Sequence, residues 1–226
     1  MKNAVVLLDS GELEIPADLR DLAAFRRWVH SPDFPETGRF DWLAGRLEVE
    51  VSPEDLYTHG TPKSAIARKL GELVEDAERG HVFIDRARLT CPTVGLSVEP
   101  DVLVLSLETL AAGHSRLVPR ASETGRYIEI EGRADLVVEC VSDGSARKDL
   151  VRLRELYHRA GVPEYWVVDA RQEPLRFDVL TNTDAGYAES PPSSDGFRLS
   201  PFLARDVRFV LSSRKQGLPF FRLDVR

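Results

Sequence analysis

Two short runs of aliphatic residues constrain the fold of this 226-residue chain more than any other feature. Residues 102–105 (VLVL) directly follow the segment Glu99-Pro100-Asp101, and residues 136–138 (LVV) run directly into Glu139. Aliphatic runs without polar alternation are typical of strands that are buried on both faces of a sheet. The sequence therefore predicts an α/β (α+β) chain with a mixed central sheet that is flanked by helices.

Periodicity places further elements around this sheet. Strands are expected at 4–8, 13–15, 81–91, 96–106, 134–141 and 164–169, a hairpin at 39–42 and 46–51, helices at 19–30, 63–77 and 148–160, and late strands at 176–180, 186–189 and 197–199. The strand, helix and strand over 134–169 indicate a parallel crossover. Residues 107–133 look like an insertion, and 81–91 with 96–106 look like one strand pair.

The chain has no long linker, so we expect a single domain over 1–226. Its core spans about 39–170 and starts with the N-terminal hairpin at 39–51, a peripheral extension covers 1–38, and a β appendix covers 171–226. Hydrophobic residues make up 42% of the chain, enough for a real core. No membrane segment or secretory signal is visible, and the two cysteines lack CxxC spacing, which favours the cytoplasm.

The formal net charge of -7 gives no general attraction to phosphate. A nucleic-acid-binding function would therefore need a local basic patch.

Asp101 and Glu139 point to one shared ligand, because carboxylates among apolar neighbours are costly to desolvate without a cation or hydrogen bonds. We expect Glu99 to join them. Mg²⁺ suits such a sparse pair, because it takes one or two carboxylates together with waters and phosphate oxygens. The alternative is that Asp101 caps a turn and Glu139 pairs with a base such as Lys148. The spacing alone leaves both interpretations open.

Several motifs resemble the Uma-two family of predicted endonucleases. They are Phe40-Asp41-Trp42-Leu43-Ala44-Gly45-Arg46-Leu47-Glu48, His59, Glu99-Pro100-Asp101, Asp135-Leu136-Val137-Val138-Glu139-Cys140-Val141-Ser142, Lys148-Asp149-Leu150, Tyr157, Gly161-Val162 and Glu164-Tyr165-Trp166-Val167-Val168-Asp169. The resemblance runs from about residue 39 to 169. It implies a restriction-endonuclease-like fold of the PD-(D/E)XK superfamily, in which Asp101 and Glu139 hold Mg²⁺ or Mn²⁺.

The resemblance also implies a catalytic lysine, and here the chain departs from the pattern. Val141 stands at the usual superfamily position, and Leu153 stands where similar chains carry a helical lysine. Leu153 falls in the apolar stripe that packs the helix onto the sheet. The nearest cations are Lys148, our choice for the catalytic group, and Arg152, which stays charged and suits phosphate binding.

His59 matches a histidine of the family, which implies that it faces the site and contacts substrate, although a loop or cap residue is the alternative. The expected function is metal-dependent endonucleolytic hydrolysis of nucleic acid, DNA in the first place. Many nucleases of this fold act as homodimers, but the sequence identifies no dimer surface. The alternative is a catalytically inactive nuclease-fold protein that serves as a binding or assembly module.

Overall fold

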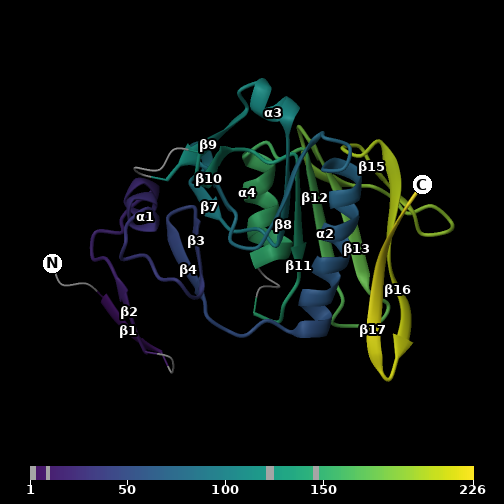
Figure 1. The fold of residues 1–226 in the computed structure, drawn as a ribbon, viewed down its shortest axis with the longest axis horizontal. Coiled ribbons are helices and arrows are strands. Elements are labelled where there is room, and N and C mark those ends of the chain that lie inside the picture. The colour runs from purple at the N-terminus through teal and green to yellow at the C-terminus, as the bar shows by residue number, and fades with distance from the viewer. Residues whose placement is uncertain (1–3, 9–10, 121–124, 145–147) are drawn as a thin grey trace.

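The computed structural model describes residues 4–8, 11–120, 125–144 and 148–226, and these residues form a layered α+β structure (Figure 1). The central sheet has the order β14 (Gly186–Glu189), β13 (Arg176–Thr183), β12 (Glu164–Asp169), β11 (Leu136–Cys140), β8 (Val102–Ser106) and β5 (Gly80–Ile84). A second sheet has the order β4 (Arg46–Glu50), β3 (Arg39–Leu43), β7 (Leu96–Val98), β6 (Arg88–Cys91), β10 (Tyr127–Gly132) and β9 (Ser115–Pro119).

One face of the central sheet is covered by helix α2 (Thr61–Val74) and by a small sheet of β15 (Arg198–Ser200), β16 (Arg205–Lys215) and β17 (Leu218–Val225). Val102 and Val104 of β8 point to this side, whereas Leu103 and Leu105 belong to the apolar cluster on the opposite side. The expectation that the central strands are buried on both faces is therefore confirmed.

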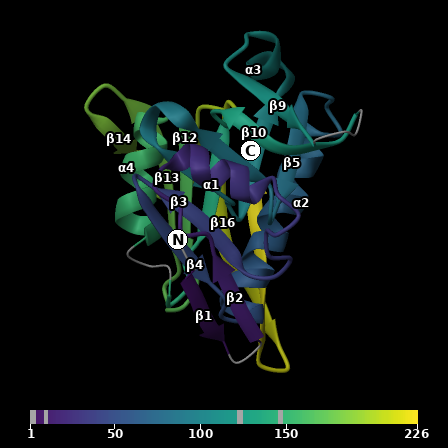
Figure 2. The same cartoon turned by 90° about the vertical axis from the view of Figure 1, so that its left-hand side faces the viewer.

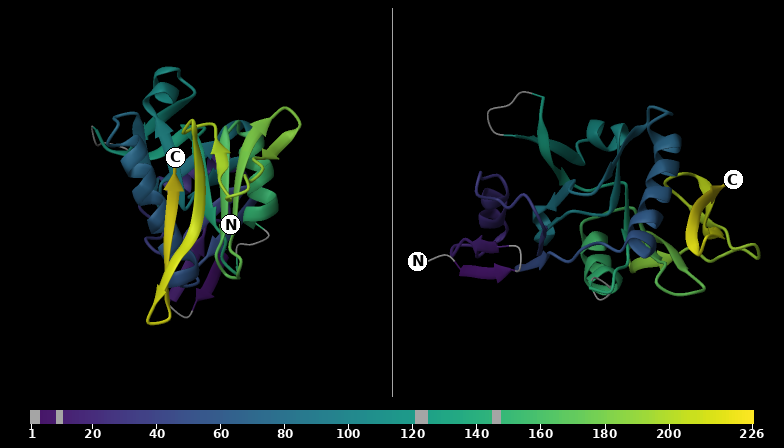
Figure 3. Two further views of the ribbon diagram at one scale, coloured as in Figure 1. Left: turned by 90° about the vertical axis from the view of Figure 1, so that its right-hand side faces the viewer. Right: turned by 60° about the horizontal axis from the view of Figure 1, so that its bottom comes forward.

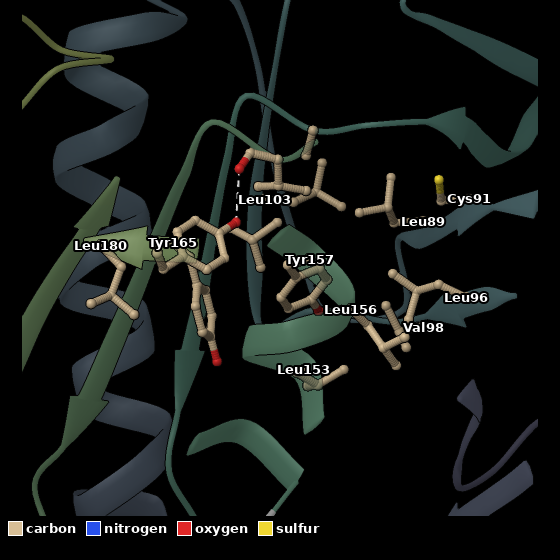
Figure 4. Packing of buried hydrophobic residues seen from close by; sticks show 14 of the residues in the cluster. Leu89, Cys91, Leu96, Val98, Leu103, Leu153, Leu156, Tyr157, Tyr165 and Leu180 are labelled. Atoms are coloured by element: carbon tan, nitrogen blue, oxygen red, sulfur yellow. Dashed lines mark hydrogen bonds between the residues drawn. The ribbon is translucent and has the colours of Figure 1, made fainter. Parts of the chain in front are cut away.

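The opposite face packs against the second sheet and against helix α4 (Arg154–Arg159), which follows the π-helical turn η3 (Lys148–Leu153). Figure 4 shows Leu153, Leu156 and Tyr157 together on this side, near Leu103 and Tyr165. Leu153 is fully buried. The helical position that similar chains give to a lysine is thus a core position in this protein.

The N-terminal part lies outside the second sheet. Strands β1 (Ala4–Leu8) and β2 (Gly11–Ile15) form a hairpin, and α1 (Leu22–Val29) lies across the sheet in Figure 2. Phe25 and Trp28 of α1 pack on Phe40 and Trp42 of β3. None of the described helices is long and apolar enough to cross a membrane.

The hairpin of β3 and β4 is confirmed, with Ala44 and Gly45 in its turn, both at positive φ. The parallel crossover is confirmed as well, because β11 pairs in parallel with β12. The expected strand pair over 81–91 and 96–106 is confirmed, but an interruption divides it between two sheets. A turn at Asp85 and Arg86, each with φ of 49°, separates β5 from β6, and the Pro100 segment separates β7 from β8.

Strands β5 and β8 pair with each other in the central sheet, and strands β6 and β7 pair with each other in the second sheet. The turn η2 (Pro92–Val94) joins β6 to β7. Residues 107–133 are likewise part of the architecture: after α3 (Leu107–Ala111), β9 and β10 complete the second sheet, where β10 pairs in parallel with β6. Strands β13 and β14 extend the central sheet, and β15 to β17 form their own sheet.

Candidate metal centre

The register between β8 and β11 brings Asp101 and Glu139 together. Val102 lies opposite Val138 in this antiparallel pair, so continuing the register by one residue sets Asp101 against Glu139. Residues opposite one another in an antiparallel pair point to the same face, and like charges in that position are destabilising. Both carboxylates are buried, with 3% and 1% of the residue exposed. The pair therefore needs a cation or several donors.

Arg39 is that cation in the structure. Its Nη1 lies 3.4 Å from Asp101 Oδ1, and its Nη2 lies 3.5 Å from Glu139 Oε2. A third carboxylate also faces it, because Arg39 Nε lies 3.1 Å from Asp41 Oδ2. Asp41, Asp101 and Glu139 are called the acidic triad below. Burial alone would lower the pKa of Arg39, but the three carboxylates raise it well above its usual value.

The second oxygen of Asp101 is held by two donors. Asp101 Oδ2 accepts a hydrogen bond of 2.7 Å from the backbone N–H of Cys140 and lies 3.2 Å from His59 Nε2. Burial alone would raise the pKa of Asp101, but the hydrogen bond from His59 and the charge of Arg39 lower it to about 2. The carboxylate is therefore ionised at neutral pH, with Oδ1 directed toward Arg39.

His59 reaches Asp101 from η1 (Leu56–Gly60), the turn that leads into α2. Its other ring nitrogen, Nδ1, contacts Glu54. Burial alone would lower the pKa of His59, but hydrogen bonds with Asp101 and Glu54 raise it to about 9. The imidazole therefore carries a positive charge at neutral pH and orients Asp101.

Glu139 is oriented in a comparable way from α4. Its Oε1 accepts a hydrogen bond of 2.7 Å from the hydroxyl of Tyr157. Burial, together with the neighbouring Glu139, raises the pKa of Tyr157 well above its usual value, so the phenol stays a donor. One oxygen of each acid is thus fixed by neutral or cationic donors, and the other faces Arg39.

Lys148 lies beside the acidic triad, next to Asp41, the member outside the pair Asp101 and Glu139. Its Nζ lies 3.2 Å from Asp41 Oδ2 and 3.9 Å from Glu50 Oε2. Burial alone would raise the pKa of Asp41, but Arg39 and Lys148 lower it. Arg152 forms an ion pair with Glu48 of β4.

Glu99 does not join this site, contrary to the expectation from the sequence. Its carboxylate pairs with Arg88 at 2.5 Å, and it borders a different cavity from that of Asp101. Glu99 and Asp101 are two residues apart, and in a regular extended segment their side chains would point to the same face. The end of β7 and the start of β8 belong to different sheets, which explains the divergence.

A cleft of about 500 Å³ opens beside Asp101. It continues into a smaller hollow of about 240 Å³, which Lys148 and Arg152 line and which shares Arg39 and Glu50 with the cleft. Acidic side chains outnumber basic ones around the larger part. The acids are Glu50, Glu54, Asp55, Asp85, Asp101 and Asp143, and the bases are Arg39, His59, Lys63 and Arg171. The lining of the cleft is therefore net acidic in the absence of a bound cation.

The donor set fits a magnesium-like ion that is shared by two carboxylates. Asp101 Oδ1 and Glu139 Oε2 contact the two terminal nitrogens of one guanidinium, so both oxygens face one small region. Mg²⁺ takes one or two carboxylates and keeps several waters. The described residues contain no group of three or more His, Cys, Asp or Glu side chains arranged to hold a metal ion.

Sequence reasoning missed Arg39 and the Tyr157 contact, and it assigned no site role to Asp41. The sequence did contain a signal for the role of β3: in Arg39-Phe40-Asp41-Trp42, the charged residues alternate with aromatic ones. The aromatic side chains pack under α1, which leaves Arg39 and Asp41 on the opposite face. The contact of Tyr157 with Glu139 depends on the docking of α4 and has no signal in the sequence.

Comparison with known proteins agrees with the fold. A profile of the Uma2 family, described as "Putative restriction endonuclease", matches residues 22–212. Among solved structures, an Anabaena variabilis ATCC 29413 protein described as "a putative nuclease belonging to DUF820" is similar, with a TM-score of 0.60 and 16% identity over 81% of this chain and 90% of that chain. The comparison with curated proteins gave no match. The chain thus shares its mixed α+β fold with that protein and belongs to the Uma2 family.

Proposed function

We propose that the protein is a metal-dependent endonuclease that hydrolyses phosphodiester bonds of nucleic acid, DNA in the first place. The observation that carries the proposal is the opposed pair Asp101 and Glu139, buried on adjacent strands and sharing one cation. In this proposal the two carboxylates hold Mg²⁺ or Mn²⁺, which supplies charge stabilisation for the phosphate and activates water.

The surrounding side chains have positioning roles in this proposal. His59 and Tyr157 each hold one carboxylate oxygen, which leaves the other directed to the shared cation. Arg39 offsets the charge of the acidic triad in the metal-free protein and competes with a divalent ion for the same oxygens. A preorganised arrangement of this kind needs little rearrangement during the reaction.

Lys148 is the proposed catalytic cation. Its ion pair with Asp41 favours an electrostatic role on the scissile phosphate over a role as general base. Arg152, on the wall of the smaller hollow, is the proposed phosphate-binding residue. Its partner Glu48 is partly exposed, so a phosphate can replace Glu48 beside Arg152. The position of His59 against Asp101 makes direct substrate contact secondary to its positioning role.

Titration calorimetry with MnCl₂ tests the metal site. Wild type is expected to bind Mn²⁺, and Asp101→Asn and Glu139→Gln are each expected to bind at least about tenfold more weakly, because each loses one of two anionic ligands. Glu129→Gln is the matched control, since Glu129 is an equally buried carboxylate that lies in another cluster. An unchanged affinity in both site variants would refute the metal centre.

A second candidate function has one observation in its favour. Leu153 fills the position of the usual lysine with a fully buried aliphatic side chain, as expected for a nuclease fold that binds a partner without cleaving it. Incubation of supercoiled plasmid and of single-stranded RNA with MgCl₂ or MnCl₂ separates the two functions. Mn²⁺ binding without cleavage of either substrate would support the binding module.

A further inference from the structure

The hairpin formed by β16 and β17 has a positive formal charge in an acidic protein, with five basic residues against two aspartates over 205–225, and Arg208 and Arg222 both pair with Asp224. Residues 207–223 contain four cationic side chains and no aspartate or glutamate, in a chain with a formal net charge of -7. The cations are Arg208, Arg214, Lys215 and Arg222. Such a segment is the local basic patch that phosphate binding requires, because the cleft beside Asp101 is acidic.

The two faces of the hairpin differ in what they contact. Val207, Phe209 and Leu223 point inward and belong to the apolar cluster that also contains residues of α2 and of the central sheet. Phe220 and Arg222 lie on the exposed side, and Phe220 is 49% exposed. The inward face anchors the hairpin, which leaves the other face and the tip for a partner.

The tip is tight and cationic. Lys215 pairs with Leu218, and the two residues between them, Gln216 and Gly217, have positive φ of 53° and 82°. Two consecutive residues of positive φ are what a two-residue hairpin turn of type I′ requires. Lys215 forms no hydrogen bond or ion pair with the described residues, so its ammonium group is available to an anion.

The hairpin also lies next to the cleft. Figures 1 and 3 show it extending along α2 and past the end of that helix where η1 leads in, the end that carries His59. The turn after β12 connects the two regions: Arg171 lines the cleft with Asp101, and Glu173 pairs with Arg214 of the hairpin. Arg214 of the hairpin is thus linked to the rim of the cleft through residues 171–173.

We propose that the β16–β17 hairpin is a nucleic-acid-binding arm that holds the sugar-phosphate backbone of a duplex beside the cleft, through Lys215 and Arg214 with Phe220 as an apolar contact. A two-stranded ribbon fits the major groove of DNA, and basic side chains on it bind phosphates. The Uma2 match ends at residue 212, so the tip and β17 lie beyond the matched segment. The proposal rests on the proposed function for the identity of the ligand.

Fluorescence anisotropy with a 30-base-pair DNA duplex, titrated at several NaCl concentrations in EDTA, tests the arm. The double variant Arg214→Ala, Lys215→Ala is expected to bind about tenfold or more weakly and to lower the slope of log K against log salt by about 2, one for each lost phosphate contact. Phe220→Ala is expected to weaken binding several-fold with an unchanged slope, because it removes no charge.

The control removes the same charge elsewhere. Arg27 on α1 and Arg116 on β9 are both exposed, and they lie on the second sheet's side of the molecule. The double variant Arg27→Ala, Arg116→Ala is expected to bind like wild type. Equal weakening in the two double variants would overturn the arm, since net charge alone would then explain the effect, and so would a wild type that does not bind the duplex.

The arm and the nuclease proposal fail in different ways. Asp101→Asn in the same assay is expected to keep the full salt slope, because the measurement needs no metal. Cleavage by wild type with an unchanged slope in the arm variant would overturn the arm and leave the nuclease standing. A reduced slope in the arm variant without any cleavage by wild type would support the arm and overturn the nuclease proposal. Urea denaturation curves of all variants confirm that each remains folded.

Discussion

Two buried charged clusters in this protein have the same kinds of side chain and different arrangements. In the acidic triad, the guanidinium of Arg39 is shared by three carboxylates at 3.1 to 3.5 Å. In the other cluster, each oxygen of Glu129 of β10 faces a different side chain: Arg26 Nε lies 2.9 Å from Oε1 and His30 Nε2 lies 2.6 Å from Oε2. The second set is called the α1 cluster.

The two clusters are alike in burial, and each borders a cavity. The side chain of Glu129 is fully buried, like that of Glu139, and His30 and Glu129 border a cavity of about 810 Å³. The difference lies in how negative charge is neutralised. Glu129 contacts Arg26 of α1 at 2.9 Å and His30 at the end of α1 at 2.6 Å, so the α1 cluster fastens α1 to the second sheet, whereas in the acidic triad three carboxylates face the one guanidinium of Arg39, which another cation could replace.

The largest expected effect is on cleavage by the acidic triad. Asp101→Asn and Glu139→Gln should each lower kcat by about a thousandfold, which corresponds to about 4 kcal/mol of lost transition-state stabilisation. Glu129→Gln in the α1 cluster should cleave at the wild-type rate per folded molecule. Plasmid-nicking rates, normalised to the folded fraction, make the measurement. Equal losses in the two clusters would remove the distinction.

The two arginines provide the next comparison. Arg39→Ala and Arg26→Ala should each lower the free energy of unfolding in EDTA by about 3 kcal/mol, because each leaves buried carboxylates without their cation. With Mn²⁺ present, only the Arg39→Ala protein should recover stability, since the ion replaces a cation that competed for Asp101 and Glu139. Urea denaturation with and without MnCl₂ measures this. Recovery in both variants, or weaker Mn²⁺ binding in Arg39→Ala, would contradict it.

The sequence indicated Asp101 and Glu139 because their aliphatic neighbours made two buried strands recognisable. It did not indicate that Glu99 would diverge toward Arg88, since this depends on the chain crossing from one sheet to the other at Pro100. The same crossing explains why the strand pair over 81–106 is divided between two sheets. Local periodicity reports the burial of a strand and carries no information about which sheet the strand joins.

The α1 cluster was equally hidden in the sequence. His30 and Glu129 are 99 residues apart and meet only because residues 107–133 form the edge of the second sheet. These residues carried no strong pattern, and their strands are set by pairing with partners that are distant in sequence. Tertiary pairing overrides weak local preference in such segments.

Lys148 tests whether the acidic triad has a catalytic cation despite Leu153. Lys148→Ala should lower kcat by about a hundredfold, the usual cost of one transition-state donor, while Mn²⁺ affinity stays at the wild-type level. Lys69→Ala is a matched control, since Lys69 pairs with Glu72 on the exposed side of α2. Single-turnover cleavage and calorimetry together make the test. Unchanged cleavage in Lys148→Ala would leave the site without a catalytic lysine.

The smallest expected effect is the response of the two clusters to acid. Burial alone would raise the pKa of Glu129, but His30, Thr90 and Arg26 lower it below 4.5. When the folded state lowers the pKa of an acid, the unfolded state binds more protons, so this contribution to stability is present above the ordinary pKa and lost as the pH falls. The same sign holds for Asp101, whose pKa is about 2 instead of 3.8.

In EDTA, the difference in unfolding free energy between wild type and Glu129→Gln should therefore shrink below pH 4.5. The difference between wild type and Asp101→Asn should begin to shrink only below pH 3.8 and should continue to shrink until about pH 2. Urea denaturation at pH 6, 4.5 and 3 separates the two responses. If the Asp101→Asn difference had already vanished at pH 3, the pKa of about 2 assigned to Asp101 would be wrong.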